Sequence, residues 1–400
     1  MGERRVSWAA IRCHGLAKRH KGLCTTLIRY ANLDKDSLMR IALFVPDLRG
    51  GGVERVRLLL AREFLAKGHD VDIVLLRKDG VLLDQVPERV RIVELGAKRA
   101  RQGFMPLVRY LREHRPEALI ASMWPLTTMA VLAAKFARYN GKVVVSEHNA
   151  LTRSARCDGL PGAALRASFR WINWRAHAVV GVSMGVIDDL RVLGLPECAG
   201  TVIHNPVMLS QAPDLPVSDP VGVWLKTERA HRLIAVGSLK DQKDYPTLIA
   251  SVKKIHDAGV EVSLLILGTG PLQGNLERQC RDLGLDGIVH FAGFVSDPAP
   301  FYRAAGLFVL SSAWEGFGNV IVEAMTAGIP VVSTDCRSGP AEILEDGRYG
   351  RLVPVGNATA LAAAILGSLG KVHDETLLRA RAAEFTPEKI GQKYLELLDS

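Results

Sequence analysis

The chain has 400 residues, 48% of them hydrophobic and 23% charged, with a net charge of +9 and a pI near 9.3. This composition excludes extensive disorder, and no run of 18 apolar residues is present that would predict a membrane-spanning helix. The length predicts two domains, and the basic balance favours polyanionic partners such as nucleotides, nucleic acid or anionic lipid.

The cysteines form neither CxxC pairs nor a zinc-like cluster. They are Cys13, Cys24, Cys157, Cys198, Cys280 and Cys336. We therefore expect free thiols in a reducing cytosol. The N-terminus lacks the continuous apolar stretch of a signal peptide, which fits this cytoplasmic expectation.

Residues 1–38 show no strand or helix period, and they carry eight Lys and Arg against three acidic residues. We interpret them as a basic N-terminal extension. At Met39 the pattern changes to a buried strand followed by a glycine turn, so the folded protein is expected to begin there.

Apolar strands and amphipathic helices alternate over residues 39–205, the predicted N-terminal domain. Strands are expected at Arg40–Pro46, Asp70–Leu76, Ala118–Ala121, Lys142–Ser146, Ala178–Val182 and Thr201–His204. Helices are expected at Val53–Lys67, Pro106–Glu113, Leu126–Tyr139, Ala163–Arg175 and Met184–Leu193. Such alternation predicts a parallel sheet covered by helices on both faces.

Residues 206–230 are rich in Pro, Ser and Asp and predict a linker. A second domain is expected over 231–375, and residues 376–400 form a C-terminal segment with a helix at Pro387–Leu398. The strands expected in the second domain are His231–Val236, Val262–Leu267, Ile288–Phe291, Leu307–Leu310 and Pro330–Ser333. The helices expected there are Thr247–Ala258, Pro271–Leu283, Pro298–Ala304 and Asn319–Ala327. The predicted fold class is α/β, with two Rossmann-like, doubly wound lobes facing across a cleft. Ligands of such sheets bind beyond the carboxyl ends of the strands.

The first strand ends in "PDLRGGGVERV", where Gly50, Gly51 and Gly52 lead into a helix. Glycines let backbone N–H groups approach an anion, and a helix N-terminus adds partial positive charge. The motif has neither GxGxxG spacing nor the GKS/GKT of a P-loop, so an ordinary tight turn explains it equally well.

Two further turns follow strands of the second domain. In "VGSLKDQKDYPTLI", Gly237 ends a strand and Lys240 and Lys243 follow, which suits a diphosphate, although solvated loop lysines are the alternative. In "LLILGTGPLQGNLE", Gly268 and Gly270 precede a helix. This turn could admit a base or a ribose, or serve only as a turn.

The segment "SSAWEGFGNVIVEAMTAGIPVVSTD" places Glu315 and Glu323 on either side of a glycine-rich helix start. Asn319 is predicted to be the N-cap of that helix. One carboxylate could accept a pair of ribose hydroxyls and the other could face a sugar, with the free N–H groups from Phe317 to Val320 directed at phosphates or sugar. The alternative is that Glu323 only favours the helix dipole.

Taken in order, these motifs resemble those of retaining family 4 glycosyltransferases with the GT-B fold (glycosyl transferases group 1). That family shares an E-x7-E element, here Glu315 to Glu323. The glycine turn, the lysine loop, "GTGP", "GFV" at Gly293–Val295 and "STDCRSGPAEIL" follow in family order. The resemblance covers essentially Met39 to Ser400.

The resemblance implies a role for each matching residue. Glu315 should contact the transferred sugar, Glu323 the ribose, and His148, in "VVVSEHN", the sugar or the acceptor. A structural role for that histidine is the alternative. Gly51 and Gly52 should approach the donor diphosphate or the acceptor. Donor contacts are implied for Gly51, Gly52, Gly237, Lys243, Gly268, Gly270, Phe294, Val295, Gly316, Phe317, Gly318, Asn319 and Val320. Within this set Lys243 should neutralise the diphosphate, and Phe294 and Val295 should flank the base through their backbone.

The chain departs from the family pattern at Ser238, where an arginine often follows the glycine of the lysine loop. Lys240 or Arg337 could replace that cationic contact. Growing negative charge on the leaving diphosphate would be stabilised by Lys243 and helix-end N–H groups. The resemblance implies retention of anomeric configuration by same-face attack. No DxD motif lies near a predicted strand end, so we expect neither a metal nor a cofactor.

The expected partners are a nucleotide-sugar, with UDP favoured, and a lipid-linked or glycan acceptor of polysaccharide assembly. Basic and aromatic residues of the first domain favour a peripheral location on the inner face of the cytoplasmic membrane. They are Arg89, Arg91, Lys98, Arg99, Arg101, Arg109, Arg112, Arg115, Arg166, Arg170, Trp171, Trp174 and Arg175. An ordinary domain with core tryptophans is the alternative.

Two other functions compete with glycosyl transfer. A nucleotide-sugar epimerase of similar architecture would form product without an acceptor. A non-enzymatic, basic, nucleotide-binding peripheral protein would explain the charge but not two carboxylates beside glycines, because acidic groups repel phosphates. The aromatic signatures of RNA-binding modules are absent from the sequence, so nucleic acid is not expected.

Overall fold

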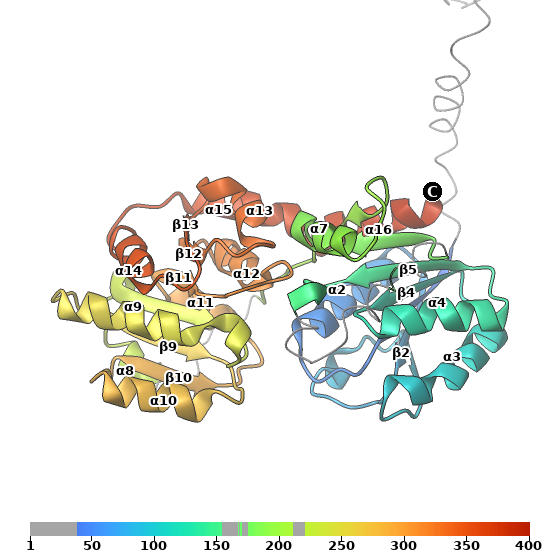
Figure 1. Ribbon diagram of the computed structural model, residues 1–400, viewed down its shortest axis with the longest axis horizontal. Coiled ribbons are helices and arrows are strands. Elements are labelled where there is room, and N and C mark those ends of the chain that lie inside the picture. Colours follow the sequence, from blue (N-terminus) through green and yellow to red (C-terminus); the bar gives the residue numbers. More distant parts are fainter. Residues whose placement is uncertain (1–37, 154–166, 168, 170–174, 211–220) are drawn as a thin grey trace, which may run out of the picture. The chain divides into compact units, whose positions relative to one another are not determined.

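The computed structural model describes residues 38–153, 167, 169, 175–210 and 221–400 (Figure 1). Met39–Ser400 forms one compact unit. The basic extension lies outside the described residues, as does most of the predicted helix Ala163–Arg175, including its two tryptophans. No helix among the described residues is both long and apolar enough to cross a membrane. Of the cysteines, Cys198, Cys280 and Cys336 are described, and all three are free thiols.

The first sheet has seven parallel strands in the order β3-β2-β1-β4-β5-β6-β7. They are β1 (Arg40–Val45), β2 (Asp70–Leu75), β3 (Arg91–Glu94), β4 (Ala118–Ser122), β5 (Lys142–Glu147), β6 (Ala178–Gly181) and β7 (Thr201–Val202). The interior strand β1 is wholly apolar from Ile41 to Val45, as expected for a strand buried on both faces.

Alternate residues of β1 point into two separate cores. Leu43 packs with helix α2 (Gly52–Ala66), whose buried face includes Val56, Leu60 and Phe64 at helical spacing. Phe44 packs on the other face with α3 (Ala100–His114), α4 (Leu126–Ala137) and α7 (Met184–Val192). The first sheet is therefore covered on both faces, as predicted.

The C-terminal helix α16 (Pro387–Asp399) returns to this first sheet. Its residues Ile390, Tyr394 and Leu398 are buried in the same core as α2 and β1. The Lys142 ammonium also donates to the carbonyl of Leu398. The predicted C-terminal segment thus completes the hydrophobic core of the N-terminal domain.

The second sheet has six parallel strands in the order β10-β9-β8-β11-β12-β13. They are β8 (Arg232–Val236), β9 (Ser263–Leu267), β10 (Val289–Gly293), β11 (Leu307–Leu310), β12 (Val331–Thr334) and β13 (Arg351–Val353). The accompanying helices are α9 (Tyr245–Asp257), α10 (Gln273–Asp282), α11 (Ala299–Ala304), α12 (Asn319–Ala327), α13 (Pro340–Ile343), α14 (Ala358–Leu366) and α15 (Glu375–Ala382). Two parallel, doubly wound α/β sheets confirm the predicted fold class.

The structure adds elements that were not predicted from sequence. Strands β3 and β13 are short and each begins with an exposed arginine, so neither shows a continuous apolar run. The short helix α8 (Val221–Trp224) lies inside the predicted linker 206–230. The buried Trp224 indole N–H lies 3.1 Å from the Leu233 carbonyl and 3.2 Å from that of Ser263, which fastens this part of the segment to the second sheet.

Candidate active site

The glycine turn lies between β1 and α2. Gly50 has a left-handed φ of +105°, and Gly51 is the N-cap of α2, whose first residue is Gly52. A Cβ added to Gly52 would lie 3.7 Å from the Asn319 amide nitrogen, and one added to Gly50 would lie 3.7 Å from the Phe294 ring. The turn therefore lies close to residues of two other predicted motifs.

A carboxylate missed by sequence reasoning lies at the same turn. Glu54, in the first turn of α2, is buried, and a Cβ on Gly51 would overlap its carboxylate. Burial raises the pKa of Glu54. Because this carboxylate already occupies the region of partial positive charge at the helix N-terminus, the turn is less suited to a phosphate than the sequence implied.

The lysine loop follows β8 and directs Lys243 onto Glu315. The Lys243 ammonium lies 2.5 Å from Oε1 of Glu315, and both side chains are largely buried. A Cβ on Gly237 would lie 2.8 Å from Cε of Lys243, so only glycine leaves room for the lysine to pass. The hydroxyl of Tyr245 donates to the Gly237 carbonyl at 3.0 Å and fixes this backbone.

Glu315 receives further hydrogen bonds from its own lobe. The Ser312 hydroxyl donates to Oε1 at 2.6 Å, and the Gln242 amide lies 3.5 Å from Oε2. The carboxylate is therefore held by charged and neutral donors, which is what a buried carboxylate requires. Ser312 and Gln242 carry no motif signal, and sequence reasoning missed both.

Glu323 lies on α12 and is half-buried. The Tyr302 hydroxyl, from α11, donates to its Oε2 at 2.9 Å. Burial raises the pKa of Glu323, an effect that the hydrogen bond from Tyr302 and the nearby charges of Arg55 and Lys243 oppose. Glu323 and Lys243 therefore lie within electrostatic reach of each other.

The structure corrects the predicted N-cap of α12. The cap is Gly318, whose left-handed φ of +103° suits glycine, and Asn319 is the first residue of the helix. The Asn319 side chain accepts a hydrogen bond from Asn205 at 2.9 Å instead of capping the helix. Backbone N–H groups at this helix start are available to a ligand.

The residues around the start of α12 are held by contacts with neighbouring segments. The Phe317 ring is buried and stacks on His204, with the ring centroids 5.1 Å apart, so its side chain is part of the core. A Cβ on Gly316 would overlap the carbonyl oxygen of His148, and the Ser183 hydroxyl donates to the Gly316 carbonyl at 2.6 Å. The Val320 carbonyl accepts from Tyr302 at 3.4 Å.

The "GTGP" turn supports the lysine loop. A Cβ on Gly268 would overlap the carbonyl of Gly237, and one on Gly270 would overlap the carbonyl of Leu239. The two turns are also joined by a hydrogen bond from the Leu239 N–H to the Thr269 carbonyl at 3.0 Å. These glycines are needed for that close approach, which leaves no space for a ribose at their α-carbons.

Phe294 and Val295 follow β10. The Phe294 ring is 52% exposed, whereas Val295 packs partly against the core. A guanidinium N–H of Arg55, on α2, donates to the Ser296 carbonyl at 3.0 Å, one residue beyond this pair. The exposed ring is thus available for contact with a planar ligand.

His148 follows β5 and is buried. Its Nε2 lies 3.0 Å from Nη2 of Arg57 and 3.1 Å from the Ser146 hydroxyl. Burial, and then the charge of Arg57, holds the pKa of His148 well below its usual value. The ring is therefore neutral at physiological pH.

The neighbouring Glu147 has hydrogen-bond partners different from those of His148, and its burial makes the stability depend on pH. It is fully buried, accepts from the Thr127 hydroxyl at 2.7 Å and from the Trp124 N–H at 3.1 Å, and burial raises its pKa to about 7. Because the folded-state pKa exceeds the unfolded one, stability is lost as pH rises through that value.

We expect Glu147→Gln to be more stable than the wild type at pH 9 by about 3 kcal/mol, because each unit by which the pKa is raised corresponds to about 1.4 kcal/mol of stability. This advantage should be lost near pH 5. A glutamine oxygen can still accept from Trp124, and its amide can donate to Thr127. Denaturant unfolding of both proteins at the two pH values tests this. An advantage that does not change with pH would contradict the assignment.

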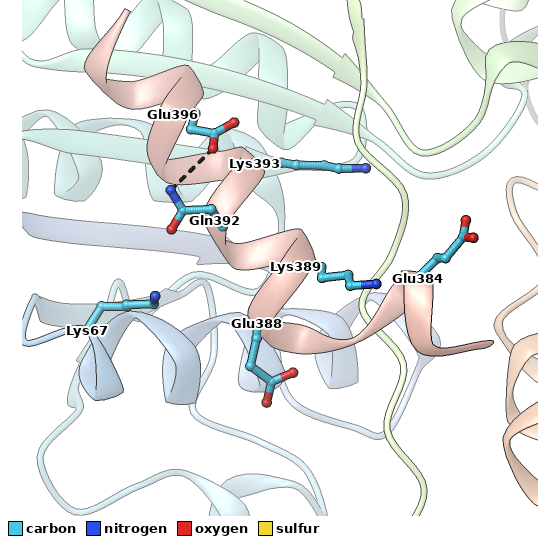
Figure 2. A pocket seen from close by; sticks show the side chains of 7 residues that line it. All are labelled: Lys67, Glu384, Glu388, Lys389, Gln392, Lys393 and Glu396. Carbon is cyan, nitrogen blue, oxygen red and sulfur yellow. Dashed lines mark hydrogen bonds between the residues drawn. The ribbon is translucent and has the colours of Figure 1, made fainter. Parts of the chain in front are cut away.

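An open hollow lies elsewhere, beside α16 (Figure 2). It is lined by residues of both charges and one neutral amide: Lys67, Glu384, Glu388, Lys389, Gln392, Lys393 and Glu396. Figure 2 shows Glu388, Lys389, Gln392, Lys393 and Glu396 spread along α16, with Glu384 just before that helix and Lys67 at the end of α2. Among the residues drawn, only Gln392 and Glu396 are hydrogen-bonded to each other. None of the predicted site residues lines it.

Two family models match the chain. The model described as Glycosyltransferase Family 4 matches residues 50–211, and the model described as Glycosyl transferases group 1 matches residues 230–371. Together they span both lobes in the order that the motifs follow.

Relatives and solved structures agree with these matches. The lipopolysaccharide core biosynthesis glycosyltransferase LpsE of Rhizobium meliloti is 37% identical over 177 residues, or 42% of this chain and 49% of that protein, so the match spans about half of LpsE. The amylovoran biosynthesis glycosyltransferase AmsD of Erwinia amylovora is 24% identical over 366 residues, which cover 87% of this chain and 96% of AmsD.

Anabaena Alr3699/HepE, solved in complex with UDP and glucose, superposes with a TM-score of 0.74 at 21% identity, covering 90% of this chain and 99% of that one. This likeness confirms the GT-B fold. Because the two family models account for both lobes, the chain belongs to the family 4, group 1 glycosyltransferases.

Proposed function

We propose that this protein transfers a sugar from a nucleotide-sugar, most simply a UDP-sugar, to a lipid-linked or glycan acceptor in polysaccharide assembly, with retention of anomeric configuration. The observation that carries the proposal is the buried pair of Lys243 and Glu315 beside the start of α12. LpsE and AmsD are glycosyltransferases of lipopolysaccharide core and amylovoran biosynthesis, and HepE was solved with UDP and glucose, which supports this substrate class.

In this proposal the donor diphosphate lies between Lys243 and the N-terminus of α12. The ammonium and the free N–H groups after Gly318 meet the negative charge that grows on the leaving diphosphate. These groups supply the charge stabilisation that a divalent cation gives in other transferases, so turnover should not require a metal. The leaving phosphate would take the acceptor proton, on the same face as the attack.

Each carboxylate has a separate part in the proposal. Glu315 contacts the transferred sugar from its position beside Lys243. Glu323, oriented by Tyr302, accepts the ribose hydroxyls. The carboxylate of Glu54 disfavours a phosphate at the glycine turn, so we assign Gly51 and Gly52 to an uncharged hydroxyl-bearing partner, the acceptor, rather than to the diphosphate.

A panel of nucleotide-sugars tests the proposed function. A ligand at 100 times its Kd stabilises the folded state by about 2.7 kcal/mol, so the correct donor should raise the melting temperature clearly. We expect UDP-sugars to do so and to be hydrolysed slowly in buffer containing EDTA. Product formed from the donor alone by epimerisation, or binding without any turnover, would favour the two competing functions.

The proposed membrane location rests on the outer face of α3. Arg101, Met105, Arg109 and Arg112 are exposed at helical spacing, and the exposed Phe136 of α4 lies beside them, because Arg112 donates to its carbonyl at 2.8 Å. Basic residues around exposed apolar side chains suit an anionic lipid surface. Arg91 is not part of this face, since it pairs with the buried Asp72.

We expect Arg101→Glu/Arg109→Glu to release the protein from vesicles containing phosphatidylglycerol, while the activity on a water-soluble acceptor is kept. The double variant Arg278→Glu/Arg281→Glu, on the exposed face of α10, changes the net charge by the same amount and should still bind the vesicles. Flotation of all three proteins is the measurement. An equal loss of vesicle binding in both double variants would show that only the net charge matters. No vesicle binding by the wild type would refute the proposed location.

A further inference from the structure

A buried arginine, Arg57, contacts the ring of His148. Arg57, on the inner face of α2, is 0% exposed, and within the described ranges no carboxylate lies within ion-pair distance of it. Its Nε donates to the Ser122 hydroxyl at 2.6 Å, and its Nη1 lies 3.4 Å from the hydroxyl of Tyr394, over whose ring the guanidinium sits. An unpaired buried charge is costly, so its retention needs a reason.

The remaining nitrogen of that guanidinium, Nη2, faces Nε2 of His148 at 3.0 Å. A guanidinium has only donors and stays protonated in proteins. Nε2 must therefore offer its lone pair, and the proton of the neutral ring must be on Nδ1. The Ser146 hydroxyl, 3.1 Å from Nε2 and 3.2 Å from the Tyr394 hydroxyl, can donate to either and does not disturb this assignment.

The other ring nitrogen carries the proton of the neutral ring. Nδ1 of His148 is buried and has no hydrogen-bond partner within the part of the chain that the structure describes. Asn205 influences the ring, but its amide nitrogen donates to Asn319 at the start of α12. The carbonyl of His148 meets Gly316, the residue after Glu315. His148 is therefore joined, through its backbone and through Asn205, to the region where donor and acceptor are expected.

We propose that Arg57 is a positioning residue that locks His148 in its Nδ1–H tautomer, so that the ring donates a hydrogen bond to a sugar or acceptor oxygen and does not act as a base. With Nε2 engaged by Arg57, the ring has no lone pair for an acceptor proton. That proton must go elsewhere, which fits its transfer to the leaving phosphate. The tautomer follows from the contacts alone, whereas its use on a sugar rests on the proposed function.

The wild-type protein provides the first test. Two-bond ¹H–¹⁵N correlation spectra of protein labelled with ¹⁵N-histidine, with the His148 signals assigned by their loss in His148→Gln, should show the proton on Nδ1 from pH 6 to pH 8. A proton on Nε2, or a doubly protonated ring, would overturn the proposal. This measurement does not depend on activity or on any Arg57 variant folding.

Variants of Arg57 provide the second test. Arg57→Met removes the donor, so we expect His148 to shift at least partly to the Nε2–H tautomer and turnover to fall about tenfold, the effect of one hydrogen bond. Arg57→Lys keeps a donor and should restore both. Arg62→Met, on the exposed face of the same helix, should change neither.

The outcomes separate the two proposals. An unchanged tautomer in folded Arg57→Met would remove the role assigned to Arg57. A locked Nδ1–H tautomer in the wild type together with full turnover in His148→Gln would keep the lock but refute its use on a sugar, and with it this part of the proposed function.

Discussion

Glu315→Gln is expected to lower turnover about 10²–10³-fold, the usual effect of removing one preorganised electrostatic contact from an active site. The carboxylate is held by Lys243 and Ser312, so the substitution keeps the shape of the side chain and removes its charge. It also leaves the Lys243 ammonium buried without its partner, which costs about 3–5 kcal/mol. Single-turnover rates and denaturant unfolding measure the two effects.

The double variant Glu315→Gln/Lys243→Met separates stability from catalysis. It removes both charges, so much of the lost stability should return while turnover stays low. The exposed pair Lys253 and Asp257 on α9 gives a matched control, and Lys253→Met/Asp257→Asn should change neither stability nor rate appreciably. Near-normal turnover in Glu315→Gln would remove this residue from the proposed site.

Gly316→Ala is expected to abolish measurable transfer and to lower the melting temperature. The added Cβ would overlap the backbone carbonyl of His148, which cannot rotate away as a side chain can. The loop carrying Glu315 would have to move, and a misplacement of about 1 Å near the reacting atoms can cost 10²-fold in rate. Rates at saturating donor, together with thermal melting, test this expectation.

Gly274→Ala is the matched control for that substitution. Gly274 lies in α10, and a Cβ there would meet nothing within 4 Å. Alanine favours a helix by up to about 1 kcal/mol over glycine, so this variant should be fully active and slightly more stable. Full activity in Gly316→Ala would show that the loop tolerates displacement, against the assignment of Glu315.

The sequence was most informative where a local pattern determines the structure. Continuous apolar runs predicted β1, β5 and β8 almost to the residue, because a strand buried on both faces must be apolar throughout. Strands β3 and β13 lack such runs and were missed. The N-cap prediction for Asn319 was wrong. The preceding residue, Gly318, adopts the left-handed conformation and starts the helix, so Asn319 is already inside it.

The contacts that give the site its chemistry could not be predicted in this way. Lys243 and Glu315 were each singled out, but their pairing depends on how β8 and β11 lie side by side in the sheet. Arg57 was unremarkable as one of many basic residues, and Tyr302 was a tyrosine in a short helix. Such roles come from packing between distant segments, which no local period encodes.

The return of α16 to the first sheet has a consequence for how this chain acquires its structure. Tyr394 lies 337 residues beyond Arg57, and its hydroxyl contacts both Arg57 and Ser146, two residues that contact the His148 ring. A nascent chain therefore cannot complete the N-terminal core, or orient that histidine, until Tyr394 has left the ribosome. Contacts of such sequence separation slow folding, so the earliest lobe to be synthesised should be the last to become fully ordered.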